Sequence, residues 1–188
     1  MPHEEPSSSG SISDHDHRSE SARNLGESKG VAEAFVELTR IVQLRFPIHK
    51  GLLILRETNG FRYSAVATFK EGSIRLNLNL YLQSGSSLFE KVAVQGRVYT
   101  ENYCGLFSGS AFERALLLDD MSCSFVIQPL NHDGQVVGLV GYSSIYPDAF
   151  ALCEEGALDR ICHSLCDEIN RARQVRSAES AGPFKTGS

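Results

Sequence analysis

The sequence has no tryptophan, no long hydrophobic run and no excess of positive charge. Its longest apolar runs, Gly51–Leu55 and Val136–Gly141, are far shorter than the roughly 18 residues that span a bilayer. Lys and Arg number 18 against 23 Asp and Glu, a formal net charge of -5, which disfavours a nucleic-acid partner because phosphate backbones bind clustered cations. No apolar stretch follows a basic start. We therefore expect no secretory signal, no membrane span and a cytoplasmic protein.

Cysteine is scarce and irregularly placed. The five residues stand at positions 104, 123, 153, 162 and 166, and no Cys-x-x-Cys pair occurs. An odd number at irregular spacing favours reduced, buried thiols over a disulfide framework or a zinc site. Cys162 and Cys166 lie four residues apart, but two ligands make a poor metal site. We predict no metal centre.

The two ends of the chain have little to bury. Residues 1–29 contain Ile12 and Leu25 as almost their only large apolar side chains, so they cannot offset the entropy of ordering and are predicted to be a disordered tail. Residues 177–188 have the composition of a flexible C-terminal tail or a truncated linker. Between them, residues 30–176 are predicted to form one domain, because 41% of the 188 residues are hydrophobic, enough to fill one core.

Hydrophobic periodicity predicts the elements of this domain. Helical spacing predicts a helix over 31–46, two short helices at 88–95 and 112–118, and a long final helix over 154–176. Strands are predicted at 51–55, 61–69, 74–82, 97–101, 124–130 and 135–144. This order predicts an α+β fold with a central antiparallel sheet of five to six strands, one face of which is covered by the two terminal helices.

Turn residues and alternation refine the predicted sheet. Asn59-Gly60 and the segment Asn131 to Gly134 predict two tight hairpins. In the strand 74–82, apolar residues occupy the even positions and Arg75 and other polar residues the odd ones. This alternation predicts a strand with a single buried face.

Two stretches of the sequence resemble the GAF domain family of small-molecule sensor modules. Gly85–Tyr99 matches a Gly-led helix followed by a glycine and a strand, keeping Gly85, Leu88, Val92 and Gly96. Ser124–Ser144 matches the strand, Pro-Leu, Asp-Gly hairpin and following strand of that family. With the leading helix, the resemblance covers about residues 30–176.

The resemblance implies a non-catalytic sensory or regulatory domain. Its small-molecule pocket is expected on the sheet face away from the terminal helices, roofed by a helical and loop insertion, and its output would pass to a downstream signalling protein or a missing effector domain. The side chains that we expect around this pocket are aromatic: Tyr63, Phe89, Tyr103, Phe107, Phe112 and Phe125.

No cofactor is predicted, and the three best-known ligands of the family are disfavoured. The Asn-Lys-Phe-Asp-Glu signature of cyclic-nucleotide-binding relatives cannot be assembled. Bilin-binding relatives attach pigment to a Cys-His pair in the insertion, whereas Cys162-His163 lies in the terminal helix. Haem would need a histidine facing the pocket, and His49 and His132 are predicted at a strand start and a turn tip.

Signatures of enzymes are missing, with one alternative kept. The sequence contains no GxSxG, HExxH or GxxxxGK[ST] motif. Gly134, Gly138 and Gly141 fall at a hairpin and in its second strand, where a phosphate-binding loop would instead open a helix. The alternative is a thiol enzyme like the free methionine sulfoxide reductases, which share this fold, with Cys104 and Cys123 beside the pocket. Their Gly-Val-Cys-Gly element is absent. A third interpretation is a degenerate GAF domain that serves only for dimerisation or protein interaction.

The terminal helices are predicted to form a homodimer. Each carries a core-facing stripe, and beside the stripes lie further apolar residues: Ile41, Leu44, Cys162 and Cys166. A second apolar strip on a helix otherwise rich in charge is a candidate self-complementary surface about a two-fold axis.

Overall fold

The computed structural model describes residues 30–56, 63–81, 87–151 and 156–180. A helix over residues 30–43 comes first. The following elements are, in chain order, β1 (Lys50–Arg56), β2 (Tyr63–Lys70), β3 (Ser73–Tyr81), α2 (Leu88–Gln95), β4 (Tyr99–Glu101), the 3-10 helix η1 (Cys104–Leu106), α3 (Ala111–Leu117), β5 (Ser124–His132), β6 (Gln135–Ser144) and α4 (Ala157–Ser180). The expected N-terminal tail and the Asn59-Gly60 turn lie outside the described residues.

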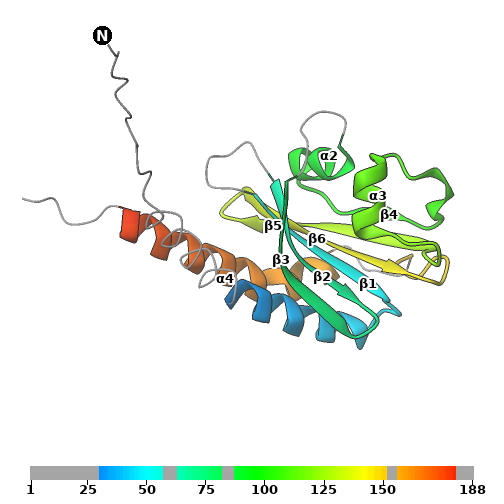
Figure 1. Ribbon diagram of the computed structural model, residues 1–188, viewed down its shortest axis with the longest axis horizontal. Coiled ribbons are helices and arrows are strands. Elements are labelled where there is room, and N and C mark those ends of the chain that lie inside the picture. Colours follow the sequence, from blue (N-terminus) through cyan, green and yellow to red (C-terminus); the bar gives the residue numbers. More distant parts are fainter. Residues whose placement is uncertain (1–29, 57–62, 82–86, 152–155, 181–188) are drawn as a thin grey trace, which may run out of the picture.

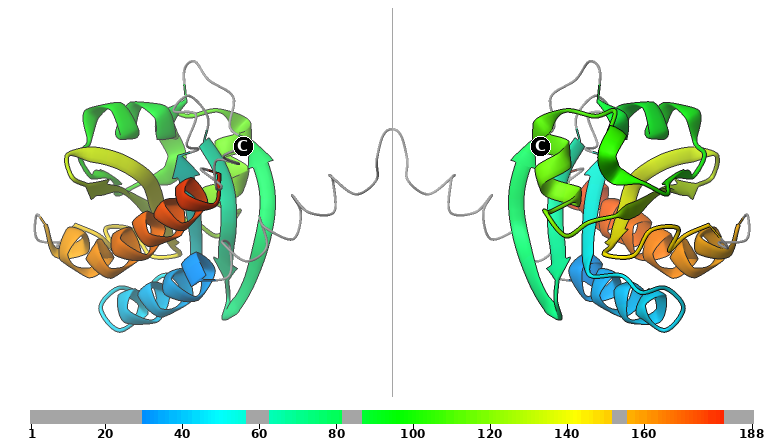
Figure 2. Two further views of the ribbon diagram at one scale, coloured as in Figure 1. Left: turned by 90° about the vertical axis from the view of Figure 1, so that its left-hand side faces the viewer. Right: turned by 90° about the vertical axis from the view of Figure 1, so that its right-hand side faces the viewer.

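One antiparallel sheet organises the molecule. Its six strands lie in the order β3-β2-β1-β6-β5-β4, and every neighbouring pair is antiparallel. The helix over residues 30–43 and α4 cover one face, whereas α2 and α3 lie over the other (Figures 1 and 2). The predicted α+β class, with terminal helices on one face and an insertion over the other, is confirmed.

Two hairpin turns use the same backbone geometry. Between β5 and β6, Asp133 and Gly134 have φ values of 49° and 75°, as expected for a two-residue turn that needs two positive φ angles. Between β2 and β3, Glu71 and Gly72 have φ values of 48° and 82°. The first hairpin is as predicted from its Asp-Gly pair. The second hairpin joins two predicted strands through Glu71-Gly72, a turn that was not predicted.

The core on the side of the terminal helices centres on Tyr142 of β6. Its ring stacks on Phe35 with centroids 6.4 Å apart and planes inclined by 11°. Its hydroxyl lies 3.2 Å from the hydroxyl of Thr39, so the one polar atom of this buried ring has a partner. Phe35 and Thr39 both belong to the helix over residues 30–43, so these contacts hold that helix to the middle of the sheet.

The core on the insertion side depends on close approach of α3 to β6. A Cβ atom placed on Gly141 would lie 2.7 Å from Cδ1 of Leu117, which is fully buried in α3. The missing side chain thus lets the helix pack directly on the strand. This packing role agrees with the interpretation of Gly141 as a strand residue rather than part of a phosphate loop.

Helix α4 is longer than predicted and is fastened to the sheet. It continues to Ser180, so residues 177–180, which we expected in the C-terminal tail, are helical. The Arg173 guanidinium donates hydrogen bonds to the carbonyl oxygens of Arg56 and Val137, the latter at 2.9 Å. Within the described part of the chain, no helix has the length and apolar character that a bilayer crossing requires.

Candidate functional site

Irregular strand pairing decides which side chains of β3 face the insertion. The register shifts between Leu53 and Ile54 in the pairing of β1 with β2, and again between Ala65 and Ala67 in the pairing of β2 with β3. Ala67 consequently packs in the cluster below the terminal helices, whereas Ala65 packs in the cluster below the insertion. Such bulges change the face to which the following residues point.

The single buried face predicted for the strand 74–82 is therefore wrong. Ile74 packs against the cluster on the terminal-helix side, but Leu78 packs against the cluster on the insertion side. Leu76 and Leu80 are exposed. The sequence does alternate, but alternate residues of a strand share one face of the sheet only while the pairing is regular. The bulges therefore direct the apolar residues of this strand to both faces.

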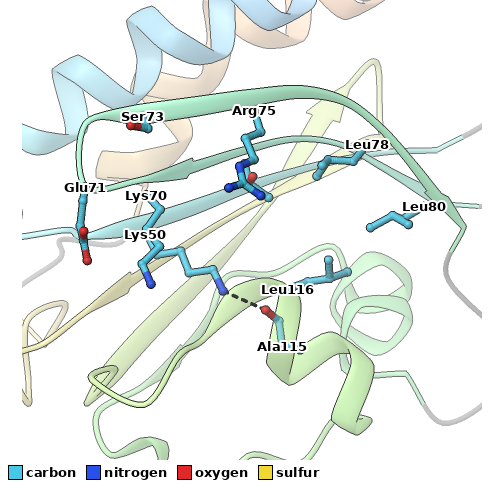
Figure 3. A pocket seen from close by; sticks show the side chains of 10 residues that line it. Lys50, Lys70, Glu71, Ser73, Arg75, Leu78, Leu80, Ala115 and Leu116 are labelled. Atoms are coloured by element: carbon cyan, nitrogen blue, oxygen red, sulfur yellow. Dashed lines mark hydrogen bonds between the residues drawn. The ribbon is translucent and has the colours of Figure 1, made fainter.

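A pocket of about 480 Å³ lies where β1, β2 and β3 face the end of α3 (Figure 3). We call it the β3–α3 pocket. Its size falls within the range typical of small-molecule sites. The lining residues are Lys50, Thr68, Lys70, Glu71, Ser73, Arg75, Leu78, Leu80, Ala115 and Leu116.

Cross-strand pairing gathers the polar wall of this pocket. Lys50 of β1 pairs with Lys70 of β2, and Lys70 pairs with Ser73 of β3. One step along, Thr68 pairs with Arg75. Directly paired residues of an antiparallel sheet point to the same face, so strand residues far apart in the sequence present their polar groups together.

Lys50 joins this wall to α3. Its Nζ donates to the carbonyl oxygens of Ala115 at 2.8 Å and Leu118 at 2.7 Å, which are at the C-terminal end of that helix. A cation is favourable there because the last carbonyls of a helix lack partners and carry partial negative charge. Burial lowers the pKa of Lys50; Asp119 opposes this shift, and Lys70 adds to it.

Asp119 anchors the loop after α3 to the sheet. Its carboxylate accepts from His49 Nε2 at 3.0 Å and pairs with Lys70 Nζ at 3.1 Å. Burial would raise the pKa of Asp119, but hydrogen bonds from His49, Lys70 and Ser122 outweigh it and hold that pKa well below its usual range. Lys70 therefore already has an anionic partner.

Four of the six aromatic residues expected around the pocket come together in the core below the insertion, and the other two do not join them. Phe89 and Phe125 are buried in the core below the insertion, where the ring of Phe107 lies 5.5 Å from that of Phe125, and Tyr63 packs against the same cluster. Tyr103 and Phe112 are instead exposed on the surface. None of the six is among the residues that line the β3–α3 pocket.

The residues expected at a dimer surface divide into two groups. Leu44 is 83% exposed, and Ile41 is half-buried. Cys162 and Cys166, by contrast, are buried within the core between α4 and the sheet. The prediction of a second apolar strip on α4 is therefore wrong, because the two thiols belong to the core-facing stripe of that helix.

Cys104 lies beside Cys123 but lacks the setting of a reactive thiol. The Cys104 amide donates to the Cys123 carbonyl at 2.8 Å. Burial raises the pKa of the Cys104 thiol to about 11; nearby Arg114 acts in the opposite direction, and Cys123 and Glu101 add to the rise. A nucleophilic cysteine needs a lowered pKa. In the part of the chain that the structure describes, no group of three or more His, Cys, Asp or Glu side chains has the arrangement of a metal site.

Glu113 positions the helix that closes the pocket, and it is not among the residues predicted from the sequence. Its buried carboxylate accepts from the amide of Ser110 at 2.8 Å, which completes a capping box at the start of α3. It also accepts from the Ser87 hydroxyl and from the amides of Leu88 at 3.3 Å and Phe89 at 3.0 Å, at the start of α2. The Ser-x-x-Glu spacing of residues 110–113 is the sequence signal that predicts half of this arrangement.

Comparison with known proteins identifies the fold. No family model matches the sequence, and no curated protein is similar to it in sequence. Among solved structures, the GAF domain of a two-component sensor histidine kinase from Bacillus halodurans matches with a TM-score of 0.63 and 12% identity, over 77% of this chain and 96% of that one. The GAF domain from an Acinetobacter phosphoenolpyruvate-protein phosphotransferase matches with a TM-score of 0.57 and 16% identity, over 88% and 99%.

An enzyme has a similar fold. Type II free methionine-R-sulfoxide reductase from Thermoplasma acidophilum matches with a TM-score of 0.57 and 10% identity, over 77% of this chain and 95% of that one. The chain therefore has the fold of a GAF domain, as its sequence resemblance implied. Because the fold is common to regulatory domains and to reductases, function has to be argued from the site.

Proposed function

We propose that this chain is a non-catalytic regulatory domain that binds a small molecule in the β3–α3 pocket, dimerises through its terminal helices and signals to another protein or domain. The observation that supports ligand binding is the pocket itself, in which the polar side chains of the sheet continue into the leucines of β3 and Leu116 of α3 lies across the cavity. A concave site with an apolar surface and a few convergent polar groups is typical of small-molecule binding.

Strand β1 offers a physical connection between the pocket and the terminal helix. Lys50, at its start, lines the pocket and holds α3. Arg56, at its other end, accepts a hydrogen bond from Arg173 of α4 through its carbonyl oxygen. A ligand that displaced Lys50 would act on one end of the strand to which α4 is fastened, which supports transmission from pocket to helix.

The electrostatics of Cys104 favour a regulatory role over a thiol reductase. A pKa of about 11 leaves about one thiol in a thousand ionised at pH 8. Burial and the neighbouring Glu101 both act against the thiolate that such chemistry requires. The raised pKa of Cys104 thus supports the regulatory role.

Native mass spectrometry tests the binding part of this proposal. The full chain, purified from its own host, should carry a small molecule that a Thr68→Trp variant loses, because the indole would occupy the pocket and tryptophan is well tolerated in strands. Thr100→Trp, at an exposed position on β4, is the matched control and should keep the ligand. A wild type without ligand, or equal loading of the two variants, would overturn ligand binding and favour a domain that only assembles partners.

A further inference from the structure

Positive charge is concentrated in the β3–α3 pocket against the trend of the whole chain. The chain has a formal net charge of -5, yet Lys50, Lys70 and Arg75 line the pocket together with one acidic residue, Glu71. Figure 3 shows the three cationic side chains extending into the same space. A cleft lined by one sign of charge attracts ligands of the other sign.

The three cations are committed to different degrees. Lys70 pairs with Asp119, and Lys50 uses two of its three N–H bonds on the carbonyl oxygens of Ala115 and Leu118. Arg75 has no ion pair or hydrogen bond with any other residue that the structure describes. Arg75 is therefore the one of these three cations with no partner among the described residues, while Lys50 keeps one N–H bond and Lys70 keeps two. A guanidinium also matches a planar or tetrahedral oxyanion best.

The opposite end of the pocket is apolar. Leu78 and Leu80 of β3 and Leu116 of α3 line it, and Leu80 remains 37% exposed. In Figure 3 the two β3 leucines follow Arg75 along the strand, so the cationic and apolar parts form one continuous wall. An apolar body seated there would remove leucine surface from water.

We propose that the β3–α3 pocket is selective for an organic anion with an apolar body, a carboxylate or phosphate whose head binds Arg75 and whose body lies on Leu78, Leu80 and Leu116. This proposal rests on the proposed function and names its ligand class. Glu71 lines the pocket on the far side of Lys70 from Arg75 in Figure 3, so repulsion by its carboxylate favours placement of the head at Arg75. Inorganic anions lack the body and would gain only the screened attraction of an open site.

Titration calorimetry on the full chain with four probes tests this ligand class. Hexanoate and hexyl phosphate carry both a charge and an apolar body, hexanol carries only the body, and inorganic phosphate carries only the charge. At least one of the two amphipathic anions should bind at least about tenfold more tightly than hexanol and inorganic phosphate, because charge-assisted hydrogen bonds and apolar burial then act together. Which of the two binds more tightly distinguishes a carboxylate from a phosphate ligand.

Two variants connect this selectivity to the named residues. Arg75→Gln should lower the affinity for the preferred anion at least about tenfold and leave the affinity for hexanol unchanged. Arg97→Gln, at an exposed site after α2, is the matched control and should bind like wild type. Leu80→Ser should weaken the binding of both hexanol and the preferred anion, because both place their apolar body on this leucine.

The outcomes separate this inference from the proposed function. Equal affinity for hexanol and the anions, an unaffected Arg75→Gln variant, or no binding of any probe would overturn anion selectivity. The pocket would still be a small-molecule site if the native mass spectra show a ligand that Thr68→Trp loses. A wild-type protein whose native mass spectrum shows no bound ligand would instead overturn the ligand-binding part of the proposed function.

Discussion

Glu113 shows how one buried carboxylate can organise the insertion. It is 2% exposed and accepts hydrogen bonds at the starts of both α2 and α3. Burial would raise the pKa of Glu113, but the hydrogen bonds from Ser87, Phe89, Ser110 and Leu88 outweigh it and lower the pKa. The ionised form is therefore the one that the fold stabilises.

The Glu113→Gln variant should be less stable at neutral pH by about 1–3 kcal/mol, because an amide presents an N–H group to donors that need an acceptor. Since the folded pKa lies below the unfolded one, the contribution is fully present above the unfolded pKa, about 4.3, and is lost as pH falls through the folded pKa. Urea denaturation should thus show a difference between wild type and variant that narrows in acid. Glu33→Gln, at an exposed position, should change stability by less than about 0.5 kcal/mol. Equal stability of wild type and Glu113→Gln at pH 7 would contradict this role.

Cys104 should behave as a structural thiol. With a pKa of about 11, it should react with iodoacetamide at pH 8 far more slowly than the same cysteine in urea-unfolded chain, as measured by mass spectrometry of the alkylated peptide. Free methionine sulfoxide should not be reduced by the wild type in an NADPH-coupled thioredoxin assay. Turnover that Cys104→Ser or Cys123→Ser abolished would establish the reductase alternative.

At the scale of elements, the contact of β1 with β6 depends on Gly138. A Cβ atom there would lie 2.5 Å from the backbone carbonyl oxygen of Ile54, which can move only if the strand moves. Gly138→Ala should therefore destabilise the fold by about 1–3 kcal/mol in urea denaturation. Gly105→Ala is the control, since a Cβ atom at Gly105 would meet nothing within 4 Å. A Gly138→Ala variant as stable as wild type would show that the two central strands separate without cost.

Local patterns predicted most elements because each depends on nearby residues. The Asp133-Gly134 pair supplies its own positive φ angles, and α2 begins and ends at Leu88 and Gln95, as the apolar spacing indicated. Its cap is local as well, because Gly96 at φ 62° ends the helix. Fold class followed from the order of these elements.

The pocket could not be predicted in the same way, because it depends on pairing between strands. Nothing in the residues of β3 alone reveals the register shifts near Ile54 and Ala65, yet these shifts place Leu78 and Leu80 beside Arg75 on the insertion side. Bulges arise from packing across strands rather than from local preference. Six aromatic residues were accordingly expected around the pocket, whereas four of them pack in the core and Tyr103 and Phe112 are exposed.

At the scale of the whole molecule, the terminal helices cover one face of the sheet, and no other described element lies over their outer surface (Figure 2). Leu44, which follows the first helix, is 83% exposed, and Ile41 one turn earlier is half-buried. We expect this pair to lie in a two-fold interface, because a self-complementary contact would cover both copies of each residue at once.

Substitution of Leu44 tests this interface better than substitution of the half-buried Ile41, since the exposed Leu44 side chain contributes little to the fold of one subunit. Light scattering at tens of micromolar should show a dimeric wild type and a folded monomeric Leu44→Glu variant, because its carboxylate would be desolvated in the interface without a partner. Val94→Glu on α2, where Val94 is 82% exposed on the opposite side of the sheet, should remain dimeric. A monomeric wild type would remove dimerisation from the proposed function, whereas a dimeric Leu44→Glu variant would move the interface elsewhere on the molecule.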